Sequence, residues 1–323
     1  MGYTALWLGV TSVTCLAALA ADTLPEIPMA YETVRLVTVQ VPLEPGDAAM
    51  DTADLVVPAI ERAGREAADL VVLPEYVLGM FDLPGPLTAK VADAARRARV
   101  NVVVGGWEKL PGYVEQWPPL PRTYANTALV FDREGLLVGK YRKNHAACGD
   151  APYCWPPKPD ERGEWTMQLG ESLPVFDLDF GRIGVLTCYD GYFFPVFETL
   201  SLKGAEILVW INGRPGVEDY IVKAASFLTC TAIVTANNSQ GAGAMICDYP
   251  ANILRQTTSP GESYLSAEIS LLALRQQRRN NRMFHQRRPE LYRELLEPHA
   301  VWEHYPYIPE HSYPPEDQEP RGQ

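Results

Sequence analysis

Short strand-like runs alternate with helix-like segments along most of the chain, and this alternation restricts the folds that the sequence can adopt. Residues 34–41 (VRLVTVQV) are rich in β-branched side chains, whereas residues 51–67 carry apolar side chains at helical spacing. The succession continues to residue 274 and predicts a single α/β domain. The further expected strands are 69–73, 100–105, 127–131, 136–141, 182–187, 206–211, 231–236, 244–248 and 264–269, and the further expected helices are 88–98, 195–203 and 217–228.

The composition is that of an acidic globular protein. The 323 residues include 28 Lys and Arg against 40 Asp and Glu, which gives a formal net charge of −12, and 47% of the residues are hydrophobic. This acidic balance argues against nucleic acid as a partner. The sequence also contains no HExxH motif, no paired CxxC motifs, no complete P-loop and no GxSxG motif, so it gives no sign of metal, nucleotide or serine-hydrolase chemistry.

The amino-terminal segment has two interpretations. Residues 5–20 form a mostly apolar run that ends in ALAAD, which is typical of a signal peptide. We therefore expect residues 1–28 to be a signal peptide with a short leader, which would place the protein outside the cytoplasm, secreted or periplasmic. The alternative is a cytoplasmic protein that starts at Met29, because no basic residue precedes Arg35. The run is short for a membrane span and no other segment is long enough, so we expect no stable membrane insertion.

Chemically capable side chains follow three of the predicted strands. Glu75 follows the run ADLVVLP, Lys143 follows GLLVGKYR, and Cys188 follows GRIGVLT. Taken singly, they are typical of a solvated carboxylate, a surface lysine and a small buried apolar residue. Because sites in open α/β sheets form at the carboxyl ends of strands, the combination favours a common site. A cysteine nucleophile needs a base and a group that stabilises an oxyanion, which Glu75 and Lys143 would supply.

The segments around these residues carry a family resemblance. LPEYVL, GKYRKNH and GVLTCYD resemble the three signature segments of the nitrilase (carbon–nitrogen hydrolase) superfamily, and they occur in the family's order. The resemblance extends over roughly residues 34–295. It implies an α/β fold of the four-layer αββα sandwich type with a single catalytic domain, which we place at residues 29–275. It also implies assembly as a homodimer or a higher homo-oligomer.

The resemblance further implies a catalytic role for each of the three residues. Cys188 would attack an amide or nitrile carbon, and Glu75 would act as general base and then as general acid. Lys143 would stabilise the oxyanion together with the backbone N–H of Tyr189. No metal or organic cofactor is required by this chemistry. Residues 276–323 form an Arg-rich extension and a Pro/Tyr-rich tail, which we interpret as a solvated or subunit-contacting region.

A second glutamate is expected in the long loop region of residues 141–173. Many members of the superfamily carry one there, and Glu161 begins an ERxxW pattern that fits it. Glu164 is the alternative, and either carboxylate would position Lys143 and the substrate. Cys148 and Cys154 lie in the same region and would form a disulfide if the chain is secreted.

The residues after the nucleophile favour amides over nitriles as substrates. Nitrilases of the superfamily typically have Trp-Glu after the cysteine, whereas this chain has Tyr189 and Asp190. Tyr189, Tyr192 and Trp210 are candidates for lining an aromatic substrate pocket. Hydrolysis of a nitrile or an N-carbamoyl compound and acyl transfer are alternatives, and a non-catalytic binding protein on the same fold is an alternative of another class.

Overall fold

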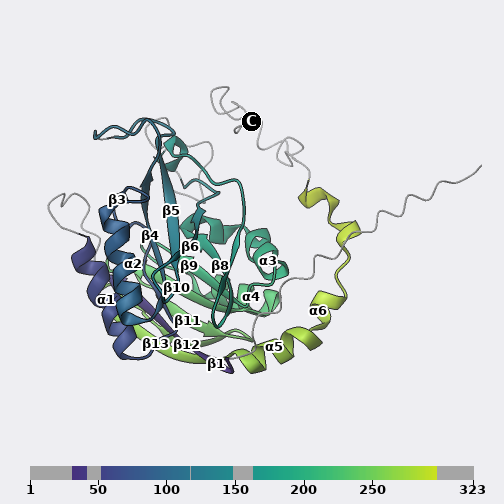
Figure 1. Ribbon diagram of the computed structural model, residues 1–323. Helices are drawn as coiled ribbons and strands as arrows, with labels where there is room; N and C mark the ends of the chain where they lie inside the picture. Colours follow the sequence, from purple (N-terminus) through teal and green to yellow (C-terminus); the bar gives the residue numbers. More distant parts are fainter. Residues whose placement is uncertain (1–30, 42–51, 117, 148–162, 297–323) are drawn as a thin grey trace, which may run out of the picture.

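The computed structural model describes residues 31–41, 52–116, 118–147 and 163–296 (Figure 1). The predicted leader at 1–28, the tail after residue 296, Glu161, Cys148 and Cys154 lie outside the described residues.

One path of paired strands connects two halves of a mixed sheet. The strand β1 (Thr33–Val41) pairs in parallel with β2 (Leu70–Val72), and its carboxyl end also pairs in parallel with β10 (Ala232–Asn238). The first half has the order β6-β5-β4-β2-β1, and the second half has the order β10-β9-β8-β7. The strands not yet delimited are β4 (Asn101–Lys109), β5 (Tyr124–Phe131), β6 (Leu137–Arg142), β7 (Val175–Leu178), β8 (Gly181–Thr187) and β9 (Ile207–Ile211). The strands off this path are β3 (Met80–Phe81), β11 (Met245–Asp248), β12 (Asn252–Gln256) and β13 (Ser263–Ser270).

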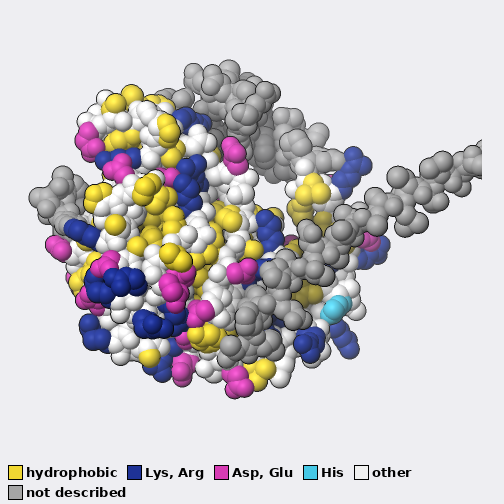
Figure 2. All heavy atoms as spheres, viewed as in Figure 1, with side chains coloured by type: hydrophobic (Ala, Val, Ile, Leu, Met, Phe, Trp, Pro, Cys, Tyr) yellow, Lys and Arg dark blue, Asp and Glu magenta, His cyan; other side chains and the backbone are white. Residues whose placement is uncertain are grey.

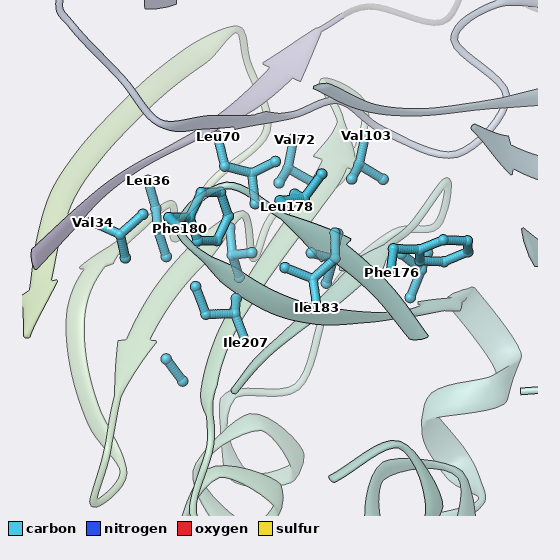
Figure 3. Packing of buried hydrophobic residues seen from close by; sticks show 14 of the residues in the cluster. Val34, Leu36, Leu70, Val72, Val103, Phe176, Leu178, Phe180, Ile183 and Ile207 are labelled. Carbon is cyan, nitrogen blue, oxygen red and sulfur yellow. The ribbon is translucent and has the colours of Figure 1, made fainter. Parts of the chain in front are cut away.

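The inner faces of the two halves pack against each other. Because side chains alternate across a strand, Leu70 and Val72 of β2 face inward while Val71 faces outward. Ile183 and Ile207 from the second half lie in the same cluster as the inward residues of the first half (Figure 3). This apolar layer between the two sheets is the centre of the protein.

Helices cover the two outer faces. On the first half, α1 (Ala53–Arg65) and α2 (Pro86–Ala98) pack against the outward residues of β1, β2 and β4. On the second half, α3 (Phe194–Leu202) and α4 (Asp219–Thr229) pack against the outward residues of β8 and β9. The two pairs of helices lie on opposite sides of the sheets (Figure 1). The predicted αββα arrangement in a single domain is therefore confirmed.

The Arg-rich segment is more firmly attached than the sequence suggested. It begins with α5 (Leu271–Asn280), which crosses the domain boundary that we placed at residue 275, and continues through α6 (Arg282–His285). Arg275 Nε lies 2.6 Å from Glu206 Oε1, and Arg278 Nη1 donates to the carbonyl of Cys230 at 2.8 Å. These two arginines hold α5 against the body of the domain, and Arg287 pairs with Glu198 of α3 at 3.0 Å. The expected solvated face is therefore limited to the exposed basic side chains of the segment (Figure 2), which are Arg279, Arg282, Arg288 and Arg293.

The strands β3, β7 and β12 were not predicted. They are short, and β7 carries Asp177, whose carboxylate binds Arg182 of β8 instead of pointing into the core. Among the described residues, no helix is both long and apolar enough to cross a membrane, and no His, Cys, Asp and Glu side chains gather in a group that could hold a metal ion.

The layer between the sheets gives a test of the fold. Ile207→Ala removes a fully buried side chain from this layer and should lower the free energy of unfolding by about 2–5 kcal/mol. Leu137→Ala removes a side chain of the same size from an exposed position on β6, and should change the free energy by less than about 0.5 kcal/mol. Urea unfolding of both variants measures the difference, and equal effects would contradict the proposed packing.

Candidate active site

The direction of the strands brings the predicted residues to one end of the sandwich. The strands β2, β1, β10, β9 and β8 are parallel neighbours, so their carboxyl ends share one edge. The strand β6 runs the same way, because it is antiparallel to β5, which is itself antiparallel to β4. Glu75 follows β2, Lys143 follows β6 and Cys188 follows β8. All three therefore lie at the same end.

Lys143 is a buried cation that contacts two carboxylates. Its side chain is 2% exposed, and its Nζ lies 3.2 Å from Glu75 Oε1 and 2.6 Å from Glu164 Oε2. Glu75 is completely buried after the β2 strand, and Glu164 belongs to the short 3-10 helix η2 (Gly163–Thr166). A buried ammonium ion requires such partners, since desolvation of an unpaired charge costs several kcal/mol.

Asn126 bridges the two carboxylates. Its Nδ2 donates to Glu75 Oε1 at 2.6 Å and to Glu164 Oε1 at 3.0 Å. The hydroxyl of Tyr76 also donates to Glu164 Oε1, and the Tyr76 ring stacks on Trp107 with the ring centroids 4.5 Å apart. The backbone N–H of Ala147 donates to Glu164 Oε2 at 2.7 Å. Glu164 is thus fixed by several donors from different segments, whereas Glu75 Oε2 is buried and has no hydrogen-bond partner among the described residues.

Burial and charge shift the acidity of each group. Burial raises the pKa of Glu75, and the Glu164 charge acts in the same direction, against Lys143 and Asn126. Burial alone would lower the pKa of Lys143, but the charges of Cys188, Glu75 and Glu164 raise it well above its usual value. Burial and the charge of Glu75 raise the pKa of Cys188 to about 12. The site therefore favours a charged lysine, a protonated thiol and a glutamate of weakened acidity.

Cys188 begins the 3-10 helix η3 (Cys188–Tyr192) in a strained backbone conformation. Its φ of +47° lies in the left-handed region, which a non-glycine residue rarely adopts and which costs about 1–3 kcal/mol. The indole Nε1 of Trp210 donates to the Cys188 carbonyl at 2.9 Å. A Cβ at Gly191 would lie 2.1 Å from Trp210 Cζ2, so the turn packs closely on this ring.

Asp190 lies in the turn that begins at Cys188 and fixes this turn (the Cys188 turn) by hydrogen bonds. Its Oδ2 accepts the backbone N–H of Thr187 at 3.0 Å and the hydroxyl of Tyr141 at 2.7 Å. Its Oδ1 accepts the backbone N–H of His145 at 3.0 Å and lies 2.8 Å from the His145 ring Nδ1. The His145 ring also stacks on Phe193, with centroids 3.8 Å apart. His145 therefore contacts the turn that carries Cys188 and connects it to the segment after Lys143.

The predicted substrate-binding residues have different environments. Tyr189 and Tyr192 are half-buried, and their ring centroids are 5.5 Å apart. Burial and the hydrogen bond to Glu218 raise the pKa of Tyr192 to about 12. Trp210 has no exposed surface and lies in the cluster with α3 and α4, so in this structure it supports the Cys188 turn and lines no open pocket. Of the two candidate second glutamates, Glu164 contacts Lys143, and Glu161 is outside the described residues.

The sequence interpretation missed several residues that complete the site. Asn126 lies near the amino end of β5, and a search restricted to carboxyl ends of strands overlooks it. Its position in the antiparallel strand opposite Trp107 of β4 brings it to the same edge. A polar residue at the start of the strand before the Lys143 segment is the signal that would have identified it. Arg214 and Glu218, which follow β9, are also near the site and gave no motif of their own.

Comparison with known proteins agrees with the fold and shows the family. Residues 37–279 match the family model of carbon-nitrogen hydrolases. The chain is 25% identical over 256 residues to a probable nitrilase of Schizosaccharomyces pombe, covering 72% of this chain and 87% of that protein. It is 30% identical over 255 residues to a formamidase of Allorhizobium ampelinum, covering 70% of this chain and 68% of that protein.

The solved structures show the same architecture. The carbon-nitrogen hydrolase of Helicobacter pylori superposes with a TM-score of 0.65 at 19% identity, over 82% of this chain and 99% of that chain. The family match extends through all three signature segments and both halves of the sandwich. The chain belongs to the carbon–nitrogen hydrolase family, the nitrilase superfamily that its three segments predicted.

Proposed function

We propose that the protein hydrolyses a small amide to a carboxylic acid and ammonia, with Cys188 as nucleophile, Glu75 as general base and acid, and Lys143 as the oxyanion-stabilising cation. The observation that carries the proposal is the arrangement of the Glu75 carboxylate. Its Oε1 accepts from Asn126 and Lys143, while its buried Oε2 has no partner among the described residues. One oxygen is thus held in place, and the other is available to accept a proton.

The acidity of the thiol makes a neighbouring base necessary. A thiol with a pKa of about 12 is almost entirely protonated at neutral pH, and only the thiolate is strongly nucleophilic. The raised pKa of Glu75 makes this carboxylate a better proton acceptor than an ordinary glutamate. In the proposed first step, Glu75 takes the proton from Cys188 Sγ as the sulfur attacks the amide carbon. The same proton then passes to the amide nitrogen, and the C–N bond breaks. Ammonia departs, and the acyl group remains bound to Cys188 Sγ as a thioester.

Lys143 and water complete the proposed cycle. The charge of Lys143 is fixed by Glu164, so it can stabilise the negative oxygen of each tetrahedral intermediate without reorganisation. Glu75 takes a proton from water, the hydroxide attacks the thioester carbon, and the proton returns to the departing sulfur. The carboxylic acid leaves and the Cys188 thiol is regenerated. Every proton in this scheme moves through Glu75.

The substrate class rests on the residues after the nucleophile and on the relatives. Tyr189 and Asp190 replace the Trp-Glu pair that is typical of nitrilases, and Asp190 holds the backbone of the turn. The relatives include a formamidase and a probable nitrilase, so the family match alone supports both kinds of substrate. We favour the amide and retain the nitrile and the N-carbamoyl compound as alternatives to be separated by assay.

Ammonia release from matched amides, nitriles and N-carbamoyl compounds tests the proposal. Wild type should release ammonia fastest from the amides. Cys188→Ala should lower the rate by about 10⁴-fold or more, because no other group can form the thioester. Cys247→Ala, which alters a buried thiol of β11, is the matched control and should keep the wild-type rate. Unchanged ammonia release by the folded Cys188 variant would contradict the mechanism, and release from nitriles alone would contradict the substrate class.

The pH dependence follows from the raised pKa of Glu75. Because the carboxylate form is the base, kcat/KM should fall as the pH drops through this pKa, by about tenfold per pH unit below it. The midpoint should lie above the usual glutamate value of 4.5. A pH profile of wild type measures it, and the residual activity of Glu75→Gln should lack this acidic limb. A midpoint at or below the usual value would contradict the assignment of Glu75 as the base.

Glu164 gives a separate test of the charge on Lys143. Glu164→Gln keeps the size of the side chain but removes the carboxylate that contacts Lys143 Nζ. We expect kcat to fall by about tenfold or more, because the cation loses its fixed position. Glu171→Gln, an exposed neighbour in the sequence, should leave kcat unchanged. Steady-state kinetics with the best amide measures both variants, and equal kcat values would show that Glu164 is dispensable.

A further inference from the structure

Arg214 is a mostly buried cation that the proposed mechanism does not use. It lies in the segment between β9 and α4, and its side chain is 12% exposed. Its Nη2 donates to Glu218 Oε2 at 2.6 Å. The guanidinium carbon lies 4.9 Å from the ring centroid of Trp210 and 5.0 Å from that of Tyr192. Arg214 therefore contacts both Trp210, which lies in β9, and Tyr192, which is the last residue of the Cys188 turn.

Both aromatic residues are connected to Cys188. Trp210 donates from its indole nitrogen to the Cys188 carbonyl, and Tyr192 is the last residue of the turn that Cys188 begins. The hydroxyl of Tyr192 also donates to Glu218 Oε1 at 2.7 Å, so one carboxylate binds both Tyr192 and Arg214. The guanidinium plane can interact with the face of an aromatic ring while it keeps its ion pair.

We propose that Arg214, held by Glu218 and packed against the rings of Trp210 and Tyr192, is a positioning residue that keeps the Cys188 turn in its reactive conformation. The inference rests on the proposed role of Cys188 as nucleophile. It assigns Arg214 no contact with the substrate. Arg214 acts through the two rings on the strained residue whose φ is +47°.

The backbone of Arg214 is fixed independently of its side chain. Its N–H donates to Asn237 Oδ1 at 3.1 Å, and its carbonyl accepts from Asn237 Nδ2 at 2.9 Å. Glu218 is the residue that precedes α4, four positions after Arg214. A guanidinium between two fixed elements loses little conformational freedom when it stacks on the rings.

The charge of Arg214 also acts on the nucleophile. Burial raises the pKa of the Cys188 thiol, and the charges of Glu75 and Glu164 raise it further, whereas Lys143 and Arg214 lower it. These four side chains are the main charged groups that act on the thiol among the described residues. Removal of Arg214 should therefore raise the pKa of Cys188 and lower the fraction of thiolate at a given pH. It should also loosen the Cys188 turn.

Alkylation of Cys188 by iodoacetamide tests the inference without any substrate. The rate is followed at several pH values by mass spectrometry of the Cys188 peptide in wild type, Arg214→Met and Arg214→Lys. The matched control is Arg62→Met. Arg62 also forms an i,i+4 ion pair, with Glu66 at 3.0 Å, and its guanidinium carbon lies 3.7 Å from the ring centroid of Tyr264, on α1 away from the nucleophile turn.

Arg214→Met should lower the alkylation rate near neutral pH by about threefold or more and should move the pH profile to higher pH. Arg214→Lys keeps the charge but loses the planar contact with the rings. Its pH profile should remain near that of wild type, while its kcat on the best amide falls by about tenfold or more with a smaller change in KM. Arg62→Met should match wild type in both the alkylation profile and kcat.

A folded Arg214→Met variant with the wild-type alkylation profile and the wild-type kcat would overturn the inference. If this variant does not fold, Arg214→Lys decides, and wild-type kcat in that variant would overturn the inference as well. A lower melting temperature alone, with an unchanged profile and kcat, would show a structural role and likewise overturn it. Alkylation does not depend on turnover, so failure of the inference is distinguishable from absence of amide hydrolysis.

Discussion

The buried charge of Lys143 is the constraint on which the rest of the site depends. An ammonium ion that is 2% exposed is stable only beside opposite charge, and Glu75 and Glu164 supply it. Two carboxylates for one cation leave an excess of negative charge, which is one reason why the pKa of Glu75 is raised. Asn126 offsets part of this excess because its amide donates to both carboxylates. In the proposed mechanism, the same excess of negative charge makes Glu75 a better proton acceptor.

The site also depends on the contact between the two halves of the sandwich. Glu75, Asn126 and Lys143 belong to the first half, whereas Cys188 follows a strand of the second. Asp190 connects the two halves, because it lies in the Cys188 turn and accepts the hydroxyl of Tyr141 from β6. The apolar layer between the sheets sets the distance between the halves, and this polar contact fixes their alignment at the site. The geometry of the candidate site is thus a property of the packed sandwich and not of any one loop.

The sequence predicted those features that depend on local periodicity and strand direction. Parallel strands place Glu75 and Cys188 at one edge, and the alternation of strand-like and helix-like segments predicted a single α/β domain. The four layers followed from the family resemblance and not from the periodicity. The sequence could not show which way Trp210 faces. In a strand that is buried on both faces, an aromatic residue has the same apolar neighbours in the sequence whether its side chain faces a pocket or a helix. Nor could it show that Arg275 and Arg278 bind within the subunit, since ion pairs between distant segments leave no periodic signal.

In the proposed mechanism, the weak acidity of the Cys188 thiol determines the order of events in the site. A Cys188 thiol with a pKa of about 12 is almost entirely protonated at neutral pH, so its sulfur becomes strongly nucleophilic only when a base accepts its proton. Glu75 is a carboxylate whose buried Oε2 has no hydrogen-bond partner among the described residues, and burial disfavours its charged form. In the proposed mechanism, proton transfer from the thiol to Glu75 neutralises the buried carboxylate at the moment when the sulfur attacks. The negative charge then develops on the substrate oxygen beside Lys143, whose positive charge is stabilised by its two carboxylates. Burial disfavours the charged form of Cys188 and of Glu75 separately, and it therefore favours the proposed transfer of charge between them.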